Sequence, residues 1–402
     1  MTYEWNHSTI NDVCVLVTDG SHSSPKSVND GKYMVSVKDF TDYGFDFASC
    51  RMISNDDYET LKRNGCVPQI DDILIGKDGA RFFEDIIIYR QREKPALLSS
   101  IAILRCDKSK ILPDFLYYVL RTPSFRQDVK DNYGSGSAIP RIILKDFKRM
   151  MVSYPSLEKQ QAIISVLTAI DSKIQANTEI NDNLEQQAQA IYHERFETVS
   201  PNDLPSDWRI VTLGEVATIS NKSFNPLKEP EMLLEHYSIP AFDEARFPVF
   251  ELSTSIKSNK FIIDASCFMI SKLNPTTKRV WKPYCLTGNA VCSTEFIVYK
   301  AKDQSITDFL YSVIDSGSFS DFMCSHVTGS TGSRQRTTPS DTLSYELILP
   351  SEDELAEFQS LVSPMYAQMR INAIENDKLK RLRDSLLPKL MSGEIDVSAV
   401  QL

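Results

Sequence analysis

The stretch SLEKQQAIISVLTAIDSKIQANTEINDNLEQQAQAIYHERFET, residues 156–198, decides how this chain folds. Along it, mostly apolar residues recur in alternating steps of four and three, and an average of about 3.5 residues places them on one stripe of an α-helix. That stripe needs a partner helix to cover it. Roughly 40 residues rising about 1.5 Å each predict a helix about 60 Å long. The stripe consists of Ile163, Leu167, Ile170, Ile174, Asn177, Asn181, Leu184, Ala188 and Ile191.

The partner helix is predicted in the same chain, 195 residues further on (Pro155 to Pro350). Ser351 and Glu354 stand before it in the pattern of a capping box, in which each side chain satisfies the other residue's free backbone N–H. The second stripe consists of Phe358, Val362, Met365, Met369, Asn372, Asn376, Leu379, Arg383 and Leu386.

Two asparagines in each stripe coincide under the same shift: Asn177 and Asn181 fall on Asn372 and Asn376. A polar residue in a seam costs stability but fixes the register, because a shifted pairing would bury an amide against hydrocarbon. The alternative is exposed asparagines on two unrelated amphipathic helices, which four coincidences in one register disfavour. Equivalent surfaces that pair are related by a twofold axis. We therefore expect an antiparallel coiled coil with a pseudo-twofold axis near these asparagines.

The remainder of the chain also consists of two similar sequence repeats. An opening Trp-x3-Thr pattern, an apolar run followed by a lysine, and a helical segment all return in the same order. The matching pairs are residues 5–13 with 208–216, 73–77 with 268–272, and 114–125 with 308–319. Such ordered matches indicate a tandem duplication.

Short β-rich runs and one helix within each repeat predict an α+β fold with two similar mixed α/β domains. The turn-rich loops differ between the repeats, as two domains with different targets would require. The expected divisions are a globular domain over 1–155, a long helix over 156–199, a second globular domain over 200–350, and a long helix with a tail over 351–402.

Composition restricts the class of protein. With 42% hydrophobic and 24% charged residues, the chain has the composition of a soluble globular protein, and it contains no apolar run of the roughly 18 residues that a membrane span needs. The N-terminus lacks the pattern of a signal peptide. The eight cysteines and five histidines are scattered, which predicts reduced thiols, no metal site and a cytoplasmic location.

The formal net charge of −10 has the wrong sign for a nucleic-acid-binding protein, because contacts to phosphates dominate such binding. Nucleic acid could be bound only through local basic loops, together with basic partners.

The sequence gives no sign of catalysis. It has no Walker loop, no Gly-rich turn for a dinucleotide or S-adenosylmethionine, no nuclease pattern and no Asn-Pro-Pro-Tyr motif of adenine methyltransferases. Asn225-Pro226 and Asn274-Pro275 begin like that motif and fail at the third position, so we interpret them as turns. No catalytic residue is predicted.

A small-residue loop running into basic residues precedes each long helix, at residues 134–141 and 329–338. Small residues with hydroxyls and free N–H groups suit phosphates, and Arg can contact guanine or phosphate bidentately. Taken singly, such loops are most simply flexible connectors with solvated arginines, but their recurrence favours a binding face on each domain. The predicted DNA-binding residues are Ser21, His22, Ser23, Lys77, Arg81, Ser135, Ser137, Arg141, Lys272, Lys278, Arg279, Thr331, Ser333, Arg334 and Arg336.

These features together resemble the specificity (S) subunit of type I restriction–modification enzymes. The resemblance rests on the Trp-x3-Thr-Leu-x-Glu-Val opening, the Gly-Ser loop, the strand ending in Pro, the long helix and the ending SLLPKLMSGEI at 385–395. It extends over the whole chain. Pro364 departs from an ideal helix and predicts a kink or a restart. Arg383 stands in the seam, where it could extend its charged end to solvent or pair with an acid such as Glu185 across the helices.

The resemblance implies a subunit without catalytic activity, in which two target recognition domains each read one half of a bipartite site in double-stranded DNA. The paired helices would set the unread spacer. Two methylation (M) subunits would dock on helices and domains, and endonuclease/translocase (R) subunits would join them. S-adenosylmethionine, ATP and Mg are expected on those partners, with no cofactor in this chain and no membrane, in the cytoplasm of a bacterium or archaeon.

Three alternatives remain at this point. The chain could serve another bipartite restriction–modification system, since the difference lies in the partner. It could be an enzyme in its own right, against which the missing motifs argue. It could also be a coiled-coil scaffold that spaces two protein-binding domains and never contacts DNA.

Overall fold

The computed structural model describes residues 5–79, 81–134, 140–328 and 335–397. The chain forms two compact units: unit 1 comprises Met1–Ser172 with Lys380–Leu402, and unit 2 comprises Lys173–Leu379. The boundary between them crosses both long helices, α6 (Leu157–Tyr192) and α11 (Glu352–Ser392). A short π-helix over His193–Glu197 follows α6.

Unit 1 is built on a four-stranded antiparallel sheet in the order β2-β10-β7-β8. A separate antiparallel pair is formed by β1, which precedes β2, and β11, which follows α5. The helices α1, α3, α4 and α5 contribute to the core together with the apolar faces of these strands. The elements are β1 (Asn6–Thr9), α1 (Ile10–Val13), β2 (Cys14–Asp19), β7 (Ile73–Gly76), β8 (Ile86–Ile88), β10 (Ile101–Cys106), α3 (Pro113–Arg121), α4 (Pro123–Asn132), α5 (Leu144–Arg149) and β11 (Met151–Tyr154).

Unit 2 repeats this plan, with the sheet β13-β21-β18-β19 and the pair β12-β24. Thr9 with Asp12 and Thr212 with Glu215 form equivalent capping boxes at the starts of α1 and α7. The tandem repeat predicted from the sequence is therefore confirmed for the four-stranded sheet, the strand pair and the capped first helix. The elements are β12 (Arg209–Thr212), α7 (Leu213–Val216), β13 (Ala217–Ile219), β18 (Cys267–Ser271), β19 (Val280–Trp281), β21 (Phe296–Ala301), α9 (Thr307–Ile314), α10 (Gly317–Ser325) and β24 (Glu346–Leu349).

The units differ in their second sheet. Unit 1 has a three-stranded sheet β6-β3-β9 and a hairpin β4-β5, and unit 2 has a five-stranded sheet β14-β17-β20-β15-β16 and a pair β22-β23. The unit 1 elements are β3 (Lys32–Val35), β4 (Phe40–Thr41), β5 (Gly44–Phe45), β6 (Arg51–Ile53), α2 (Asn55–Arg63) and β9 (Ala96–Leu97). Those of unit 2 are β14 (Ser223–Phe224), β15 (Leu233–Tyr237), α8 (Ile239–Ala245), β16 (Val249–Leu252), β17 (Lys260–Ile262), β20 (Ala290–Ser293), β22 (Val327–Thr328) and β23 (Arg336–Thr337).

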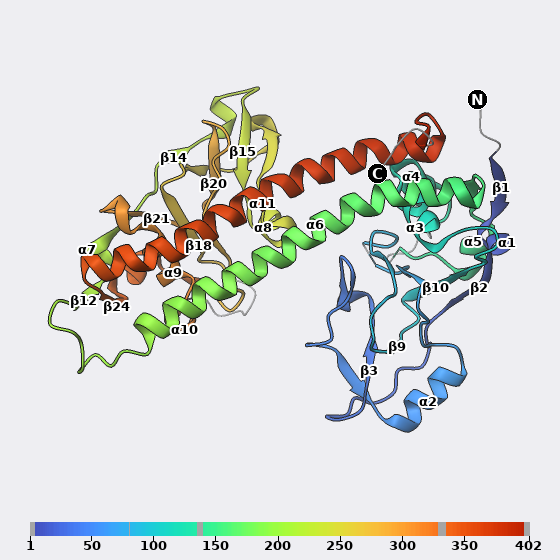
Figure 1. The fold of residues 1–402 in the computed structure, drawn as a ribbon, viewed down its shortest axis with the longest axis horizontal. Helices are drawn as coiled ribbons and strands as arrows, with labels where there is room; N and C mark the ends of the chain where they lie inside the picture. The colour runs from blue at the N-terminus through green and yellow to red at the C-terminus, as the bar shows by residue number, and fades with distance from the viewer. Residues whose placement is uncertain (1–4, 80, 135–139, 329–334, 398–402) are drawn as a thin grey trace. The chain divides into compact units, whose positions relative to one another are not determined.

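The two long helices lie side by side within each unit and run in opposite directions (Figure 1). In unit 1 Asp171 of α6 pairs with Arg383 of α11, with Nη1 and Oδ1 2.9 Å apart. In unit 2 Arg195, just after α6, pairs with Glu354 near the start of α11 at 2.9 Å. Every residue of the two predicted stripes is buried or half-buried. The antiparallel coiled coil is therefore confirmed.

The four seam asparagines bond to each other and to their surroundings in unit 2. Asn372 Nδ2 donates to Asn181 Oδ1 at 2.8 Å, and Asn181 Nδ2 donates to the Met369 carbonyl at 3.1 Å. Asn177 Nδ2 donates to Asn376 Oδ1 at 2.9 Å and to Glu375 Oε2 at 2.7 Å. Asn177 and Asn372 are only 1% and 4% exposed, so their amides depend on these bonds.

Two expectations about the second helix are met only in part. The helix α11 does not restart at Pro364 but continues through it, and Val362 and Tyr366 on either side are buried in the unit 2 core. Arg383 pairs with an acid of the other helix, but this acid is Asp171 rather than Glu185, which instead pairs with Arg246 at 2.8 Å. His193 is exposed and contacts Glu197.

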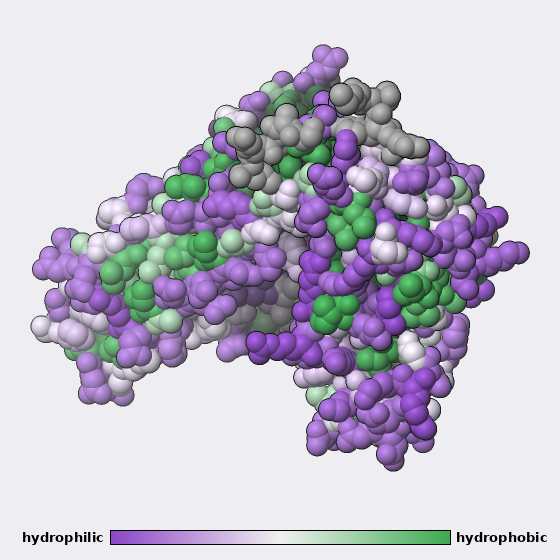
Figure 2. Space-filling model, turned by 45° about the vertical axis from the view of Figure 1, so that its right-hand side comes forward, coloured by the Kyte–Doolittle hydropathy of each residue, from purple (hydrophilic) through white to green (hydrophobic). Residues whose placement is uncertain are grey.

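Hydrophilic residues cover most of the face shown in Figure 2, with scattered hydrophobic patches between them. Isolated exposed side chains such as Leu361 and Leu382 belong to α11. Among the described residues, no helix is both long and apolar enough to cross a membrane.

We expect substitutions at Asn177 and Asn376 to have coupled effects on the free energy of unfolding. Asn177→Leu alone should destabilise the protein by about 1–3 kcal/mol, because Asn376 and Glu375 lose a buried partner. The double change Asn177→Leu with Asn376→Leu should recover most of that loss. Urea unfolding of both single variants and of the double variant gives the coupling energy. Additive single effects would contradict the pairing.

Candidate nucleic-acid interface

In unit 1 the lysine loop after β7 lies against the residues that leave the Gly-Ser loop. The Ile142 N–H donates to the Lys77 carbonyl at 3.0 Å, and the Gly79 N–H donates to the Pro140 carbonyl at 3.0 Å. Asp78 and Arg141 form an isolated antiparallel bridge between the two segments. Gly79 has φ +97°, a conformation that glycine adopts without strain.

Unit 2 makes the same junction with a different sequence. The Thr337 N–H donates to the Lys272 carbonyl at 3.1 Å, and the Asn274 N–H donates to the Gln335 carbonyl at 2.9 Å. Leu273 and Arg336 form the bridge equivalent to Asp78 and Arg141. The structure therefore brings together, in both units, the two basic loops that the sequence assigned to one face. We call this arrangement the paired-loop junction.

The side chain of Lys77 does not project freely from its loop. Lys77 is 7% exposed, and its ammonium lies 3.4 Å from Asp19 Oδ2 and 3.5 Å from Asp78 Oδ1. Asp19 also contacts the exposed His22 ring at 3.3 Å. Lys77 therefore ties the loop after β2 to the paired-loop junction.

The serine loop of unit 1 is held by its own hydroxyls. Ser21 is buried, its N–H donates to the Leu97 carbonyl at 2.7 Å, and its Oγ donates to the Ser23 carbonyl at 2.8 Å. At Gly20, a Cβ would lie 2.3 Å from the Leu97 carbonyl oxygen. This close approach requires glycine, and it fixes the position from which the His22 side chain projects into solvent.

Other predicted cations form ion pairs with carboxylates of the chain. Arg336 contacts Glu295 bidentately, with both N–O distances at 3.0 Å, and these bonds raise the pKa of the guanidinium. Arg279 binds Asp243 in α8 in the same way at 2.5 and 2.9 Å. Arg81 pairs with Asp85 at 3.0 Å.

Lys278 pairs with Asp315, the residue that follows α9. Its Nζ lies 2.8 Å from Asp315 Oδ1 and donates to the Asp315 carbonyl at 2.7 Å. Burial raises the pKa of Asp315 to about 6, and the charge of Lys278 opposes that rise. Gln189 Nε2 of α6 also donates to Asp315 Oδ2 at 2.8 Å.

Sequence analysis missed the carboxylates that hold these cations. Glu295, Asp243 and Asp315 lie far from their partners in sequence and share no motif with them, so no signal could have identified them. Among the described residues, no group of three or more His, Cys, Asp or Glu could hold a metal ion. The predicted residues Ser135, Ser137, Thr331, Ser333 and Arg334 lie outside the described residues.

Comparison with known proteins gives one consistent family. Residues 3–186 match the model of the type I restriction modification DNA specificity domain. The chain is 25% identical to the specificity subunit of the type I restriction enzyme MjaIX of Methanocaldococcus jannaschii, covering 72% of this chain and 71% of that protein. It is 23% identical to the HindI specificity subunit of Haemophilus influenzae, covering 73% and 80%.

The fold also matches a solved structure, the S subunit of a type I restriction–modification system from M. genitalium. The TM-score is 0.57, with 16% sequence identity, and the match covers 96% of each chain. Both repeats and both long helices are therefore part of the shared fold.

The buried carboxyl of Asp315 predicts a distinct pH dependence. Because its pKa is about 6 in the folded protein and about 3.9 in an unfolded chain, the folded state binds the extra proton between these values. Stability should therefore fall as pH rises from about 4 to 6, by roughly 3 kcal/mol at 1.36 kcal/mol for each pKa unit. The Asp315→Asn variant should not show this fall in stability.

The measurement is the free energy of urea unfolding of both proteins at several pH values between 4 and 7.5. Lys278→Met should extend the fall above pH 6, since the carboxylate loses its cation, and Lys278→Arg is the charge-matched control. Parallel curves for the natural protein and Asp315→Asn would contradict the raised pKa.

Proposed function

Because the chain belongs to the specificity-subunit family of type I restriction–modification enzymes, we propose that it selects the DNA sequence on which a restriction–modification complex acts. Each globular domain, over 1–155 and 200–350, reads one half of a bipartite target in double-stranded DNA. The observation that carries this proposal is the paired-loop junction, which recurs in both units and brings the same two basic loops together.

The ion pairs at the junction suit recognition rather than non-specific attraction. A guanidinium held by a carboxylate, as Arg336 is by Glu295, approaches DNA in a fixed orientation. Such a cation exchanges its carboxylate for a base edge or phosphate only when the geometry on DNA compensates for the lost ion pair. A shared four-stranded scaffold with a different second sheet in each unit supports two different half-sites.

The helix pair supplies a fixed length. Its helices α6 and α11 contain 36 and 41 residues, and the buried asparagine pairs hold them in one register. We assign to this pair the spacing of the two half-sites and the docking of two methylation subunits, with endonuclease/translocase subunits joining the complex. The chain itself performs no catalysis. S-adenosylmethionine, ATP and Mg act on the partner subunits.

Substitutions at the two junctions should affect different halves of the target. Arg141→Ala should cost about 1–3 kcal/mol at one base position of the unit 1 half-site, and Arg336→Ala should do the same for the unit 2 half-site. Lys272→Ala should weaken binding to all sequences alike, as loss of a phosphate contact does. Binding by the assembled complex and methylome sequencing of the host measure these effects.

Glu295→Gln tests the same site from the opposite direction. It releases Arg336 and should strengthen DNA binding, whereas Glu346→Gln changes the charge equally without touching Arg336. Unchanged specific binding after alanine substitution of Lys77, Arg141, Lys272 and Arg336 together would remove the basis for this interface.

Lengthening both helices by one heptad should lengthen the spacer. The positions after Ser172 and after Leu379 are suited to this change, because they leave the Asp171–Arg383 pair on one side and the asparagine pairs on the other. Seven residues at about 1.5 Å each add roughly 10 Å, or about three base pairs at 3.4 Å each.

Methylome sequencing should then show unchanged half-sites with a longer spacer. A heptad in α6 alone is the control, since it disrupts the pairing. An active protein that carries both insertions and retains the original spacer would show that the helices do not set it.

A further inference from the structure

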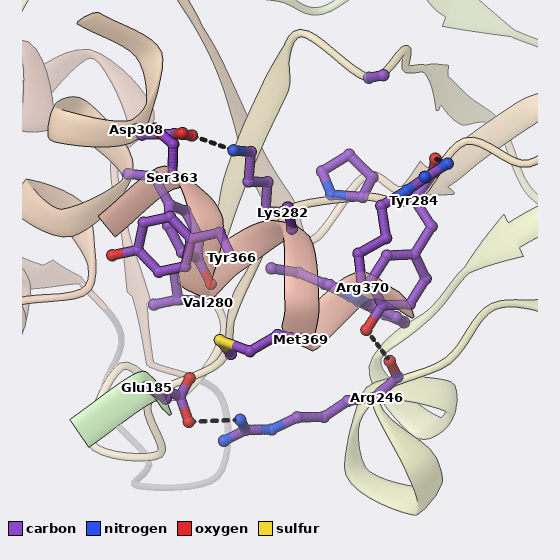
Figure 3. A pocket seen from close by; sticks show the side chains of 15 residues that line it. Glu185, Arg246, Val280, Lys282, Tyr284, Asp308, Ser363, Tyr366, Met369 and Arg370 are labelled. Atoms are coloured by element: carbon purple, nitrogen blue, oxygen red, sulfur yellow. Dashed lines mark hydrogen bonds and ion pairs between the residues drawn. The ribbon is translucent and has the colours of Figure 1, made fainter. Parts of the chain in front are cut away.

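Unit 2 contains a cavity of about 300 Å³ between its globular part and the helices α6 and α11 (Figure 3). Aromatic rings form much of its wall, namely Trp281, Tyr284, Tyr311 and Tyr366. Ala367 and Arg370 of α11 are exposed at the cavity, so it is accessible from solvent. Nothing in the function proposed above uses it.

The charged groups of the wall are almost balanced. Arg246 pairs with Glu185 at 2.8 Å, and Lys282 pairs with Asp308. The guanidinium of Arg370 donates to the Tyr284 carbonyl at 3.1 Å. Three positive and two negative side chains leave one net positive charge in an aromatic wall.

Unit 1 contains a region that the sequence repeat makes equivalent to the wall of this cavity. The 195-residue shift that aligns the helices puts Asp171 on Tyr366, and the helical repeat puts Tyr117 on Tyr311. The contacts agree with this alignment: Tyr118 donates to Asp171 Oδ2 at 2.7 Å, and Ser312 Oγ lies 2.7 Å from the Tyr366 hydroxyl.

The ion pair next to the cavity also has its counterpart in unit 1. Arg90 pairs with Asp114 at 2.7 Å, as Lys282 pairs with Asp308 in unit 2. Asp114 and Asp308 occupy the same position of the helical repeat.

In unit 1 the tip of the hairpin β4-β5, formed by Asp42 and Tyr43, lies near this place. The Tyr43 side chain is 44% exposed, and its partial burial raises the pKa of its phenol to about 12. Asp171, Tyr117 and Arg383 are among the groups whose charge acts on the phenol. Tyr43 is therefore within electrostatic range of the residues equivalent to the wall of the unit 2 cavity.

The hairpin is fixed by the residue that follows Arg90. Gln91 accepts from the Phe45 N–H at 2.8 Å and donates to the Phe45 carbonyl at 2.9 Å. After Lys282, unit 2 has Pro283, whose side chain cannot make these bonds. The place that Tyr43 approaches in unit 1 is the cavity in unit 2.

We propose that the unit 2 cavity receives an aromatic side chain with a neighbouring carboxylate, presented by the methylation subunit. The proposal rests on the function proposed above, which supplies that partner. The volume suffices, since a cavity of about 150 Å³ already holds benzene. The aromatic walls favour a ring, and the net positive charge favours an adjacent acid, as Asp42 is adjacent to Tyr43.

The test fills the cavity from its rim. Ala367→Trp places a large ring at the opening, and Leu252→Trp, at an exposed position of β16 outside the helix pair, is the matched control. Circular dichroism and thermal unfolding confirm that both variants are folded. We expect Ala367→Trp to weaken binding of one of the two methylation subunits at least tenfold, and Leu252→Trp to bind both as the natural chain does.

A photo-crosslinking residue at position 367 identifies the occupant. The expected product joins position 367 to a methylation-subunit peptide with an aromatic residue beside an Asp or Glu. A crosslink only to DNA or to the endonuclease subunit would overturn the proposal. Equal affinity of Ala367→Trp and the natural chain for the methylation subunits would also overturn it. So would binding of 4-hydroxyphenylacetate in the cavity without displacement of a methylation subunit.

These outcomes are separable from failure of the proposed function. If the natural chain binds no methylation subunit, the function itself is wrong. If the natural chain and Ala367→Trp bind it equally and DNA recognition is intact, only the cavity proposal is wrong.

Discussion

The buried amide contacts between α6 and α11 are the constraint on which the rest of the structure depends. An apolar seam alone tolerates sliding by a heptad, because one hydrocarbon contact resembles the next. Asn181 with Asn372, and Asn177 with Asn376, do not tolerate it, since a slid helix would leave amides without partners in a buried seam. The register of the helices then determines which side chains of the other helix each core receives, such as Leu387 and Leu390 of α11 in unit 1 and Tyr192 of α6 in unit 2.

The second constraint is the balance of charge around the predicted DNA-binding cations. A chain with a net charge of −10 can present cations to DNA only locally, and here carboxylates orient those cations. Glu295 and Asp243 each occupy the two-donor edge of a guanidinium. The acidic residues near the proposed interface therefore position the basic ones, and their cost to DNA attraction is offset by the fixed geometry they give.

The sequence predicted what depends on periodicity and repetition. The stripes of α6 and α11, their antiparallel pairing and the recurrence of β-rich runs with a helix in both units all follow from local pattern or from the repeat. The five-stranded sheet of unit 2 could not be predicted, because it joins short strands such as β15 and β20 through a parallel pairing between distant segments. The continuity of α11 at Pro364 likewise depends on burial of Val362 and Tyr366, which overrides the local tendency of proline. For the candidate interface, the meeting of the two basic loops was predicted, while the carboxylates that hold their cations were not.

The path of the chain through the two units has a consequence for its gene. Unit 2 is one uninterrupted stretch, Lys173–Leu379, whereas unit 1 is assembled from the two segments that flank it. Both ends of that stretch lie inside helices of similar pattern, so an exchange between related genes with breakpoints in the two helix-coding segments would replace unit 2 whole and leave the unit 1 core intact. Recombination within the two helix-coding segments would therefore exchange unit 2 as a whole without requiring a new fold.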